Sequence, residues 1–347
     1  FRSIWISVKR VGSLCQCFSL FTFLKGLKDE TPFEHVRKLA DLWKSEVERY
    51  PDRICQIKTY ADLMQVQKEG KIGAVITVEE GGVYEGSIEK LHTLYDLGVR
   101  ISTLTWNFPN ELGFPNPAQE EGKPYLPDLE NGLTPTGIAF VEEMERLGIV
   151  IDLSHLNDAG IRDVFAHTRG PVIASHSNAR GACFHLRNLS DEMIRQLAER
   201  GGVTGINFCP SFLREEEPAT KKASTMDMVR HMKYLRNVGG IDIIGLGTDF
   251  DGFSGETDVP DTAHMQHLAD VMSHEGFTDE EIEKVFSKNV LRVFRECWNK
   301  TTAPVMPPEA PLYNHSADAQ TVLPSPRSPQ SGLLSSREPG RTSDRSR

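Results

Sequence analysis

Residues 149–155 read IVIDLSH, and residues 171–176 read PVIASH. Each stretch is a short apolar run of the length of a buried strand, closed by a serine and a histidine. A helix-like segment separates the two runs, a pattern that predicts consecutive parallel strands of a βαβ unit. We therefore expect His155 and His176 to lie at the same edge of a parallel sheet.

The same alternation of apolar runs and helical periodicity continues from about residue 13 to residue 298. It predicts a (β/α)₈ barrel of the TIM type, in which functional residues sit at the carboxyl ends of strands. Seven strands are predicted, whereas such a barrel has eight. The eighth strand is therefore expected either to lie within this sequence without a recognisable pattern or to be the first strand of the barrel and precede Phe1. The predicted strands are 14–21, 72–78, 101–105, 150–153, 172–175, 203–208 and 243–247.

The sequence also predicts the boundaries of a helix and the position of a long loop. Thr134 and Pro135 predict a helix start, and Gly148 predicts its end. Residues 107–132 hold five prolines and no periodicity, which predicts a long loop at the exit of a strand. We expect one barrel domain over residues 1–300. The remaining residues, 301–347, carry 8 of the 20 prolines and few apolar residues, so they predict a disordered tail.

Composition narrows the class of partner. The formal net charge of -10 argues against nucleic acid or an anionic membrane, since both require a basic surface, and it favours a small-molecule substrate. The six cysteines include no CxxC pair, which predicts reduced thiols and a cytoplasmic location. The apolar run at residues 13–24 is too short to span a bilayer and is interpreted as a strand.

A carboxylate joins the two histidines in the predicted arrangement. Glu79 follows the apolar run of residues 74–78. Two histidines and one carboxylate form a ligand set that catalytic zinc uses, with a position left for water. Asp249 follows the last predicted strand, where it could act as a general base or simply cap a turn. Spacing alone leaves these two roles of Asp249 open.

From about Ser13 to Trp298 the sequence resembles the zinc-dependent membrane dipeptidases, also called renal dipeptidases, and their bacterial relatives. The order and spacing of several motifs carry the resemblance. They are VEEGG at 78–82, GVRISTLTWN at 98–107, IDLSH at 151–155, SHS at 175–177, RN at 187–188 and GTDFDG at 247–252.

The resemblance implies a metal centre of two zinc ions. In that family a glutamate bridges the two ions, and two later histidines complete one of them. The matching positions are Glu79, His155 and His176, with Glu80 as the alternative bridge because this chain has two glutamates before the paired glycines.

The resemblance also implies hydrolysis of dipeptides by a metal-activated water. Arg187 matches the arginine that binds the substrate carboxylate, and Asp249 matches the aspartate that protonates the departing amine. Trp106 replaces a histidine that holds the developing oxyanion in mammalian members, and it is expected to contact substrate. A homodimer is left open.

One family feature does not match. The first zinc in the family depends on a His-x-Asp pair at the end of strand one, and His35 is the only early histidine here. We therefore expect a truncated segment, with ligands for one zinc plus the bridging glutamate. Two alternatives follow: a non-catalytic protein with an incomplete zinc site, or another amidohydrolase-type barrel. Such barrels commonly bridge their metals with a carboxylated lysine, and no lysine ends a predicted strand.

Overall fold

The computed structural model describes residues 15–215 and 222–299. The predicted tail, 301–347, lies outside the described residues, as does the segment before Cys15. The division of the chain into a barrel domain and a tail therefore stays a prediction.

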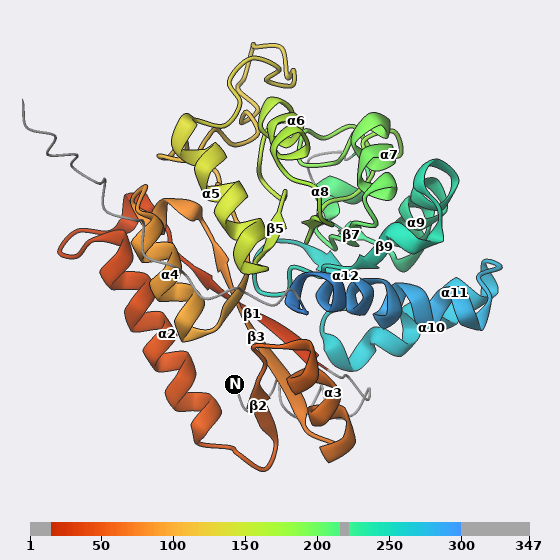
Figure 1. The fold of residues 1–347 in the computed structure, drawn as a ribbon. Coiled ribbons are helices and arrows are strands. Elements are labelled where there is room, and N and C mark those ends of the chain that lie inside the picture. Colours follow the sequence, from red (N-terminus) through yellow and green to blue (C-terminus); the bar gives the residue numbers. More distant parts are fainter. Residues whose placement is uncertain (1–14, 216–221, 300–347) are drawn as a thin grey trace, which may run out of the picture. The chain divides into compact units, whose positions relative to one another are not determined.

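Parallel strands form one curled sheet, and each is followed by helical segments that pack around it (Figure 1). Seven of the strands follow one another in the order β1-β3-β4-β5-β6-β7-β9. They correspond to the seven predicted strands, and the prediction of a TIM-type α/β fold is confirmed. Their bounds are β1 Cys15–Phe21, β3 Ile72–Glu79, β4 Val99–Thr103, β5 Val150–Asp152, β6 Ile173–Ala174, β7 Val203–Ile206 and β9 Ile244–Leu246.

A short strand that the sequence pattern did not predict, β2 (Ile54–Gln56), also joins the sheet. Strand β2 pairs with the first residues of β3, whereas all seven residues of β1 pair with β3. Strand β2 must therefore share with β4 the edge of β3 that faces away from β1. It does not close the barrel, because β1 and β9 are the end strands of the described sheet and do not pair with each other.

Helix α5 (Pro135–Leu147) begins and ends where the sequence predicts. Thr134 accepts a hydrogen bond from the Gly137 amide at the start of α5, Pro135 occupies the first turn, and Gly148 ends the helix with φ 77°. No described helix combines the length and the apolarity needed to cross a bilayer. The helices of eight or more residues are α2 Pro32–Glu48, α3 Tyr60–Glu69, α4 Ile88–Leu97, α5 Pro135–Leu147, α6 Asp158–His167, α7 Asp191–Glu199, α9 Thr225–Gly239, α10 Met265–His274 and α12 Asn289–Trp298.

Shorter elements connect these helices. They are α8 Pro210–Leu213, α11 Asp279–Glu283, a π-helical turn at Lys284–Lys288, and the two-residue strands β8 Lys222–Ala223 and β10 Glu256–Thr257, which pair with each other. The predicted long loop is confirmed, since residues 107–132 contain no helix or strand.

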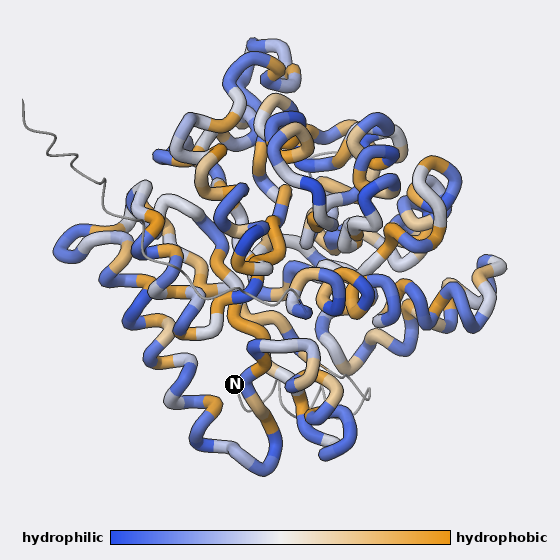
Figure 2. The backbone as a smooth tube through the Cα atoms, in the orientation of Figure 1, coloured by the Kyte–Doolittle hydropathy of each residue, from blue (hydrophilic) through white to orange (hydrophobic). Residues whose placement is uncertain are grey.

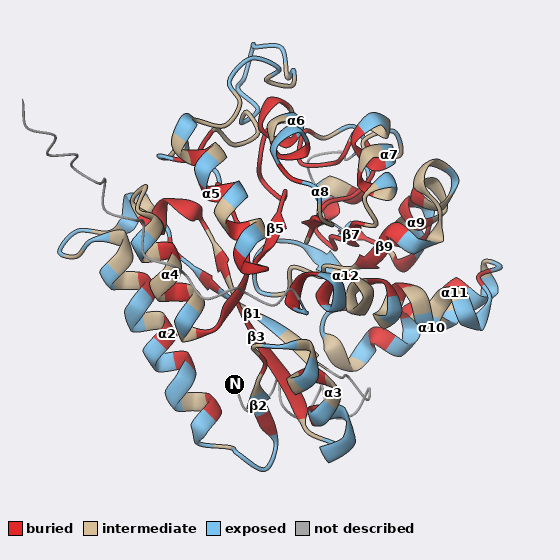
Figure 3. Cartoon of the chain, viewed as in Figure 1, coloured by how far each residue is buried: buried red, intermediate tan, exposed pale blue. Residues whose placement is uncertain are grey.

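The two faces of the sheet are buried in different ways. On β3, Ala74 and Ile76 pack into a large cluster with the surrounding helices, whereas Val75 packs with α3 and α12. Hydrophilic and hydrophobic residues alternate along the covering helices, as α2 shows in Figure 2. Strands β3 to β7 are largely buried, whereas β1 is mostly exposed or half-buried (Figure 3). Because side chains alternate along a strand, Glu79 shares the inner face with Val75. Apolar residues thus fill the amino-terminal end of this face, and polar ones occupy its carboxyl-terminal end.

Two glycines let the last strands approach the end of β6 closely. A Cβ at Gly205 or Gly247 would lie 2.1 Å or 1.7 Å from the Ser175 carbonyl oxygen. Any side chain at either position would push β7 or β9 away from the segment that carries His176. This close approach places Asp249, two residues after Gly247, beside the same edge.

Candidate metal centre

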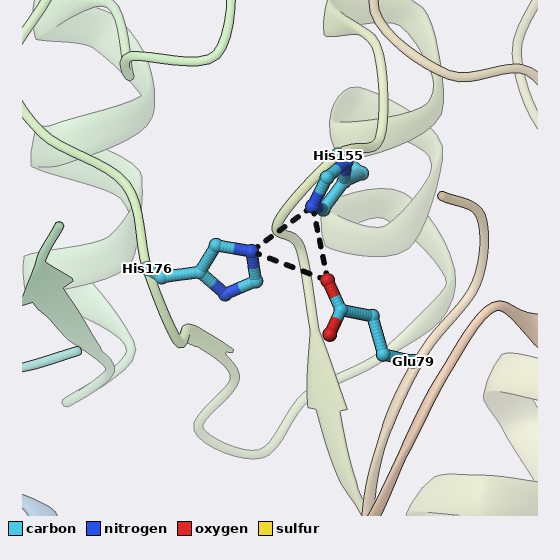
Figure 4. Close-up of side chains that lie close together, drawn as sticks. All are labelled: Glu79, His155 and His176. Carbon is cyan, nitrogen blue, oxygen red and sulfur yellow. Dashed lines mark hydrogen bonds and ion pairs between the residues drawn. The ribbon is translucent and has the colours of Figure 1, made fainter. Parts of the chain in front are cut away.

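Three predicted ligands meet at the carboxyl edge of the sheet (Figure 4). Glu79 ends β3, His155 follows β5, and His176 follows β6. The two histidine Nε2 atoms lie 3.0 Å apart. Glu79 Oε1 lies 3.3 Å from Nε2 of His155 and 3.6 Å from Nε2 of His176. The structure therefore brings together one carboxylate and two imidazoles that could hold a metal ion.

Backbone strain gathers at the same edge. Among the described residues other than glycine, five have a positive φ, and four of these lie just after β3, β5 or β9. His155 has φ 71°, Glu80 101°, Asp249 57° and Asp251 71°. Such conformations cost about 1–3 kcal/mol each and persist only where the surroundings hold them. The Asn116 amide, which donates to the His155 carbonyl at 2.8 Å, is one such contact.

The two imidazoles are held neutral and oriented. Burial lowers the pKa of both His155 and His176 well below the usual histidine value, and the nearby Arg187 guanidinium lowers it further. The Asn107 side-chain oxygen lies 2.9 Å from Nδ1 of His155, and the Ser175 hydroxyl lies 2.6 Å from Nδ1 of His176. An amide oxygen only accepts, so Nδ1 of His155 carries the proton and its Nε2 lone pair faces Glu79.

Replacing Asn107 with alanine is expected to weaken the binding of a metal ion, probed with zinc, by about 10–100-fold, because the partner that selects the tautomer of His155 is lost. Competition with a chromophoric chelator measures the affinity. Asn299→Ala, in the C-terminal cap of α12, is the matched control and should bind zinc like the parent chain. An unchanged affinity in Asn107→Ala would show that the Asn107 contact does not orient His155.

The neighbouring Glu80 has a different place. It is fully buried, and its carboxylate accepts hydrogen bonds from the amides of Gly82 and Trp106 and from the Asn110 side chain. Burial raises its pKa. Because these bonds turn Glu80 into the 107–132 loop, Glu79 is the glutamate that reaches the histidines.

Arg187 places a buried cation beside the cluster. Its guanidinium donates to the Ser177 hydroxyl at 3.3 Å and to the His176 carbonyl at 3.5 Å. Within residues 15–215 and 222–299 no carboxylate oxygen lies within ion-pair distance of it; burial lowers its pKa, and the charges of Asp249 and Glu79 oppose that shift. A buried guanidinium without a carboxylate in contact is costly, and an anionic ligand would offset that cost.

Asp249 follows β9 and faces the same space. The Asn207 side chain donates to its carboxylate at 3.1 Å. Burial and the Glu79 charge raise the pKa of Asp249 to about 6, against the opposing effects of Arg187 and Asn207. Its backbone carbonyl, not its side chain, accepts from the Gly252 amide in the following turn. The described contacts therefore leave the carboxylate available for chemistry.

Trp106 lies beside the cluster on the side of His155, with its ring centroid 6.1 Å from that of His155.

The sequence did not point to three residues of the site, and each of them contacts a predicted site residue. Asn107 and Ser175 orient the histidines, and Asn207 donates a hydrogen bond to Asp249. The sequence could have indicated Asn207, because it is a single amide side chain within the apolar run 203–209. Asn107 lies in a loop, where no feature of the sequence indicates a role.

Two histidines and a carboxylate at the carboxyl ends of strands of one curled parallel sheet are typical of the class of metal-dependent hydrolases. The model of the membrane dipeptidase family, peptidase family M19, matches residues 7–304. The chain therefore belongs to this family of metallopeptidases, and the predicted resemblance is confirmed.

Similar proteins agree with this assignment. An uncharacterized protein in the pqqA 5′ region of Klebsiella pneumoniae is 32% identical over 240 residues, which cover 69% of this chain and 88% of that one. The solved metallopeptidase dipeptidase AC has a TM-score of 0.76 at 27% identity, covering 85% of this chain and 88% of its own. A Rhodobacter sphaeroides metallopeptidase, solved with a phosphinate mimic of L-Ala-D-Ala, has a TM-score of 0.75 at 26% identity, covering 84% and 89%.

Proposed function

We propose that this chain is a zinc dipeptidase that hydrolyses the peptide bond of a dipeptide and recognises its terminal carboxylate through Arg187. The observation that carries the proposal is the buried guanidinium without an ion pair, next to the cluster of Glu79, His155 and His176. The Rhodobacter relative, solved with a mimic of L-Ala-D-Ala, makes that dipeptide the first substrate to test.

The donor set fits zinc. Zinc binds nitrogen and oxygen at about 2.0–2.1 Å, so two ligands of a tetrahedral ion lie about 3.3 Å apart. The three distances between Glu79 and the histidines, 3.0, 3.3 and 3.6 Å, surround this value. When bound, zinc lowers the pKa of its water and polarises the peptide carbonyl. A second zinc, expected from the family resemblance, would share Glu79.

The chain's own residues supply the rest. Arg187 binds the substrate carboxylate with a forked pair of donors and so positions the peptide bond. Asp249, with a pKa near neutrality, accepts a proton from the attacking water and returns it to the departing amine. Trp106 forms the wall beside His155 and offers a single indole donor to the substrate.

The test compares L-Ala-D-Ala with its C-terminal amide in the zinc-loaded chain. We expect the amide to have a kcat/KM about 10²–10³-fold lower, because it leaves the Arg187 charge unpaired. Arg187→Met should lower kcat/KM for the dipeptide by a similar factor and barely change it for the amide. Equal turnover of acid and amide by the parent chain would overturn the proposed recognition.

Metal analysis separates this proposal from its rivals. Two zinc ions per chain with dipeptide turnover would exclude a non-catalytic protein with an incomplete site. One zinc or none, without turnover, would favour that alternative. An amidohydrolase with a carboxylated lysine would need a lysine at the cluster, where the described structure has Glu79. The homodimer and the cytoplasmic location stay proposals.

A further inference from the structure

Four aromatic side chains form one continuous surface beside the candidate metal centre. We call this surface the aromatic rim; it consists of Phe21, Phe23, Trp106 and Phe108. The ring centroids of Phe21 and Phe23 lie 4.9 Å and 5.9 Å from that of Trp106. Phe108 lies 5.7 Å from Trp106 and 5.9 Å from Phe23. The rim joins the end of β1 to the start of the 107–132 loop.

Two of the four rim residues, Phe21 and Phe23, are exposed, and the other two are half-buried. Phe21 is 38% and Phe23 45% exposed, although each makes an edge-to-face contact with Trp106. Exposed aromatic surface that is already ordered by its neighbours can accept an apolar group with little loss of conformational entropy. The rim is therefore a preformed contact surface, apolar except at Phe108, where the Lys25 ammonium lies 3.6 Å from the ring centroid.

The rim continues directly into the metal cluster. Trp106 packs beside His155, and Ser19, two residues before Phe21 on the same face of β1, donates to the Glu79 carboxylate at 3.2 Å. Arg187, by contrast, contacts the segment of His176. The rim thus contacts the His155 ring, whereas the guanidinium hydrogen-bonds the backbone of His176, although its charge acts on both imidazoles.

This placement decides which part of a dipeptide meets the rim. A dipeptide extends about 7 Å, enough to reach from one side of a metal ion to the other. With its carboxylate at Arg187 and its peptide bond at the cluster, its amino-terminal residue points to the His155 side. We infer that the aromatic rim is the binding site for an apolar or aromatic side chain of the amino-terminal residue, which makes the preferred substrates dipeptides such as Phe-Ala or Leu-Ala. This inference rests on the proposed dipeptidase function.

The experiment measures kcat/KM for Phe-Ala and Gly-Ala in the zinc-loaded chain. We expect Phe-Ala to be preferred by about tenfold or more, as contact of one large apolar group with a preformed surface implies. In Phe23→Ala the preference should fall below about threefold, with most of the loss in the value for Phe-Ala. Leu42→Ala, an exposed apolar residue on α2, is the control and should keep the parent preference.

Calorimetric binding of phosphinate mimics of Phe-Ala and Gly-Ala gives the same comparison without turnover. Tenfold tighter binding of the Phe-Ala mimic, with this preference lost in Phe23→Ala, would support the role of the rim even if the chain hydrolysed no dipeptide. Absence of hydrolysis would instead remove the proposed dipeptidase function. Hydrolysis of both dipeptides with equal kcat/KM, unchanged in Phe23→Ala, would overturn the rim and leave the dipeptidase proposal standing.

Discussion

Replacing His176 with alanine is expected to lower zinc affinity by about 10²–10³-fold and to abolish dipeptide turnover. Apparent zinc binding energies of about 10–16 kcal/mol are shared among about four ligands, so one ligand accounts for several kcal/mol. The loss is specific because burial keeps His176 neutral, with Nε2 facing Glu79 at 3.6 Å. Isothermal titration with zinc and an assay of L-Ala-D-Ala measure the two effects.

His167→Ala is the matched control for this experiment. His167 ends α6, and its Nδ1 lies 3.3 Å from an oxygen of Glu142, a residue of α5 at the surface, so its described contact lies outside the cluster. Its removal should change neither zinc affinity nor turnover. If His176→Ala bound zinc as tightly as His167→Ala, the cluster would not be the metal site.

Asp249→Asn is expected to lower kcat by about 10²–10⁴-fold with zinc retained, because the amide cannot exchange a proton with water or the departing amine. The same change should stabilise the metal-free protein at neutral pH. The pKa of Asp249 rises from its ordinary 3.8 to about 6 on folding, so the folded state binds the proton more tightly than the unfolded state does. The free-energy cost of folding with Asp249 therefore grows as the pH rises from about 3.8 to about 6, and it stays constant above pH 6.

Unfolding of the metal-free protein by urea at two pH values measures this cost. At pH 8 the asparagine variant should be more stable by about 1–3 kcal/mol, and at pH 3.5 the difference should vanish. Loss of activity with gain of stability is typical of a functional residue. A residue that merely capped a turn would show unchanged kcat, and that result would remove the assigned role.

The sequence predicted the strands of this fold well because strands of a parallel sheet are buried on both faces and appear as apolar runs. Residues 72–79 and 150–152 are clear examples. Strands β2 and β8 were missed because no buried apolar run marks them: β2 reads ICQ and β8 reads KA, each with a single buried residue.

Only those site residues that directly follow a strand could be predicted from the sequence. His155 and His176 follow apolar runs, so their shared edge could be predicted. The choice between Glu79 and Glu80 could not be derived from pattern, because it depends on the positive φ of Glu80 and on its partners in the long loop. Asn107 orients His155 from that same irregular loop, whose path no periodicity encodes.

Anomalous diffraction at the zinc absorption edge, from crystals of the zinc-loaded chain, tests the central claim most directly. We expect a peak about 2.0–2.2 Å from Glu79 Oε1 and from Nε2 of both His155 and His176. A zinc peak bound elsewhere, or none at this cluster in a chain that hydrolyses L-Ala-D-Ala, would contradict it.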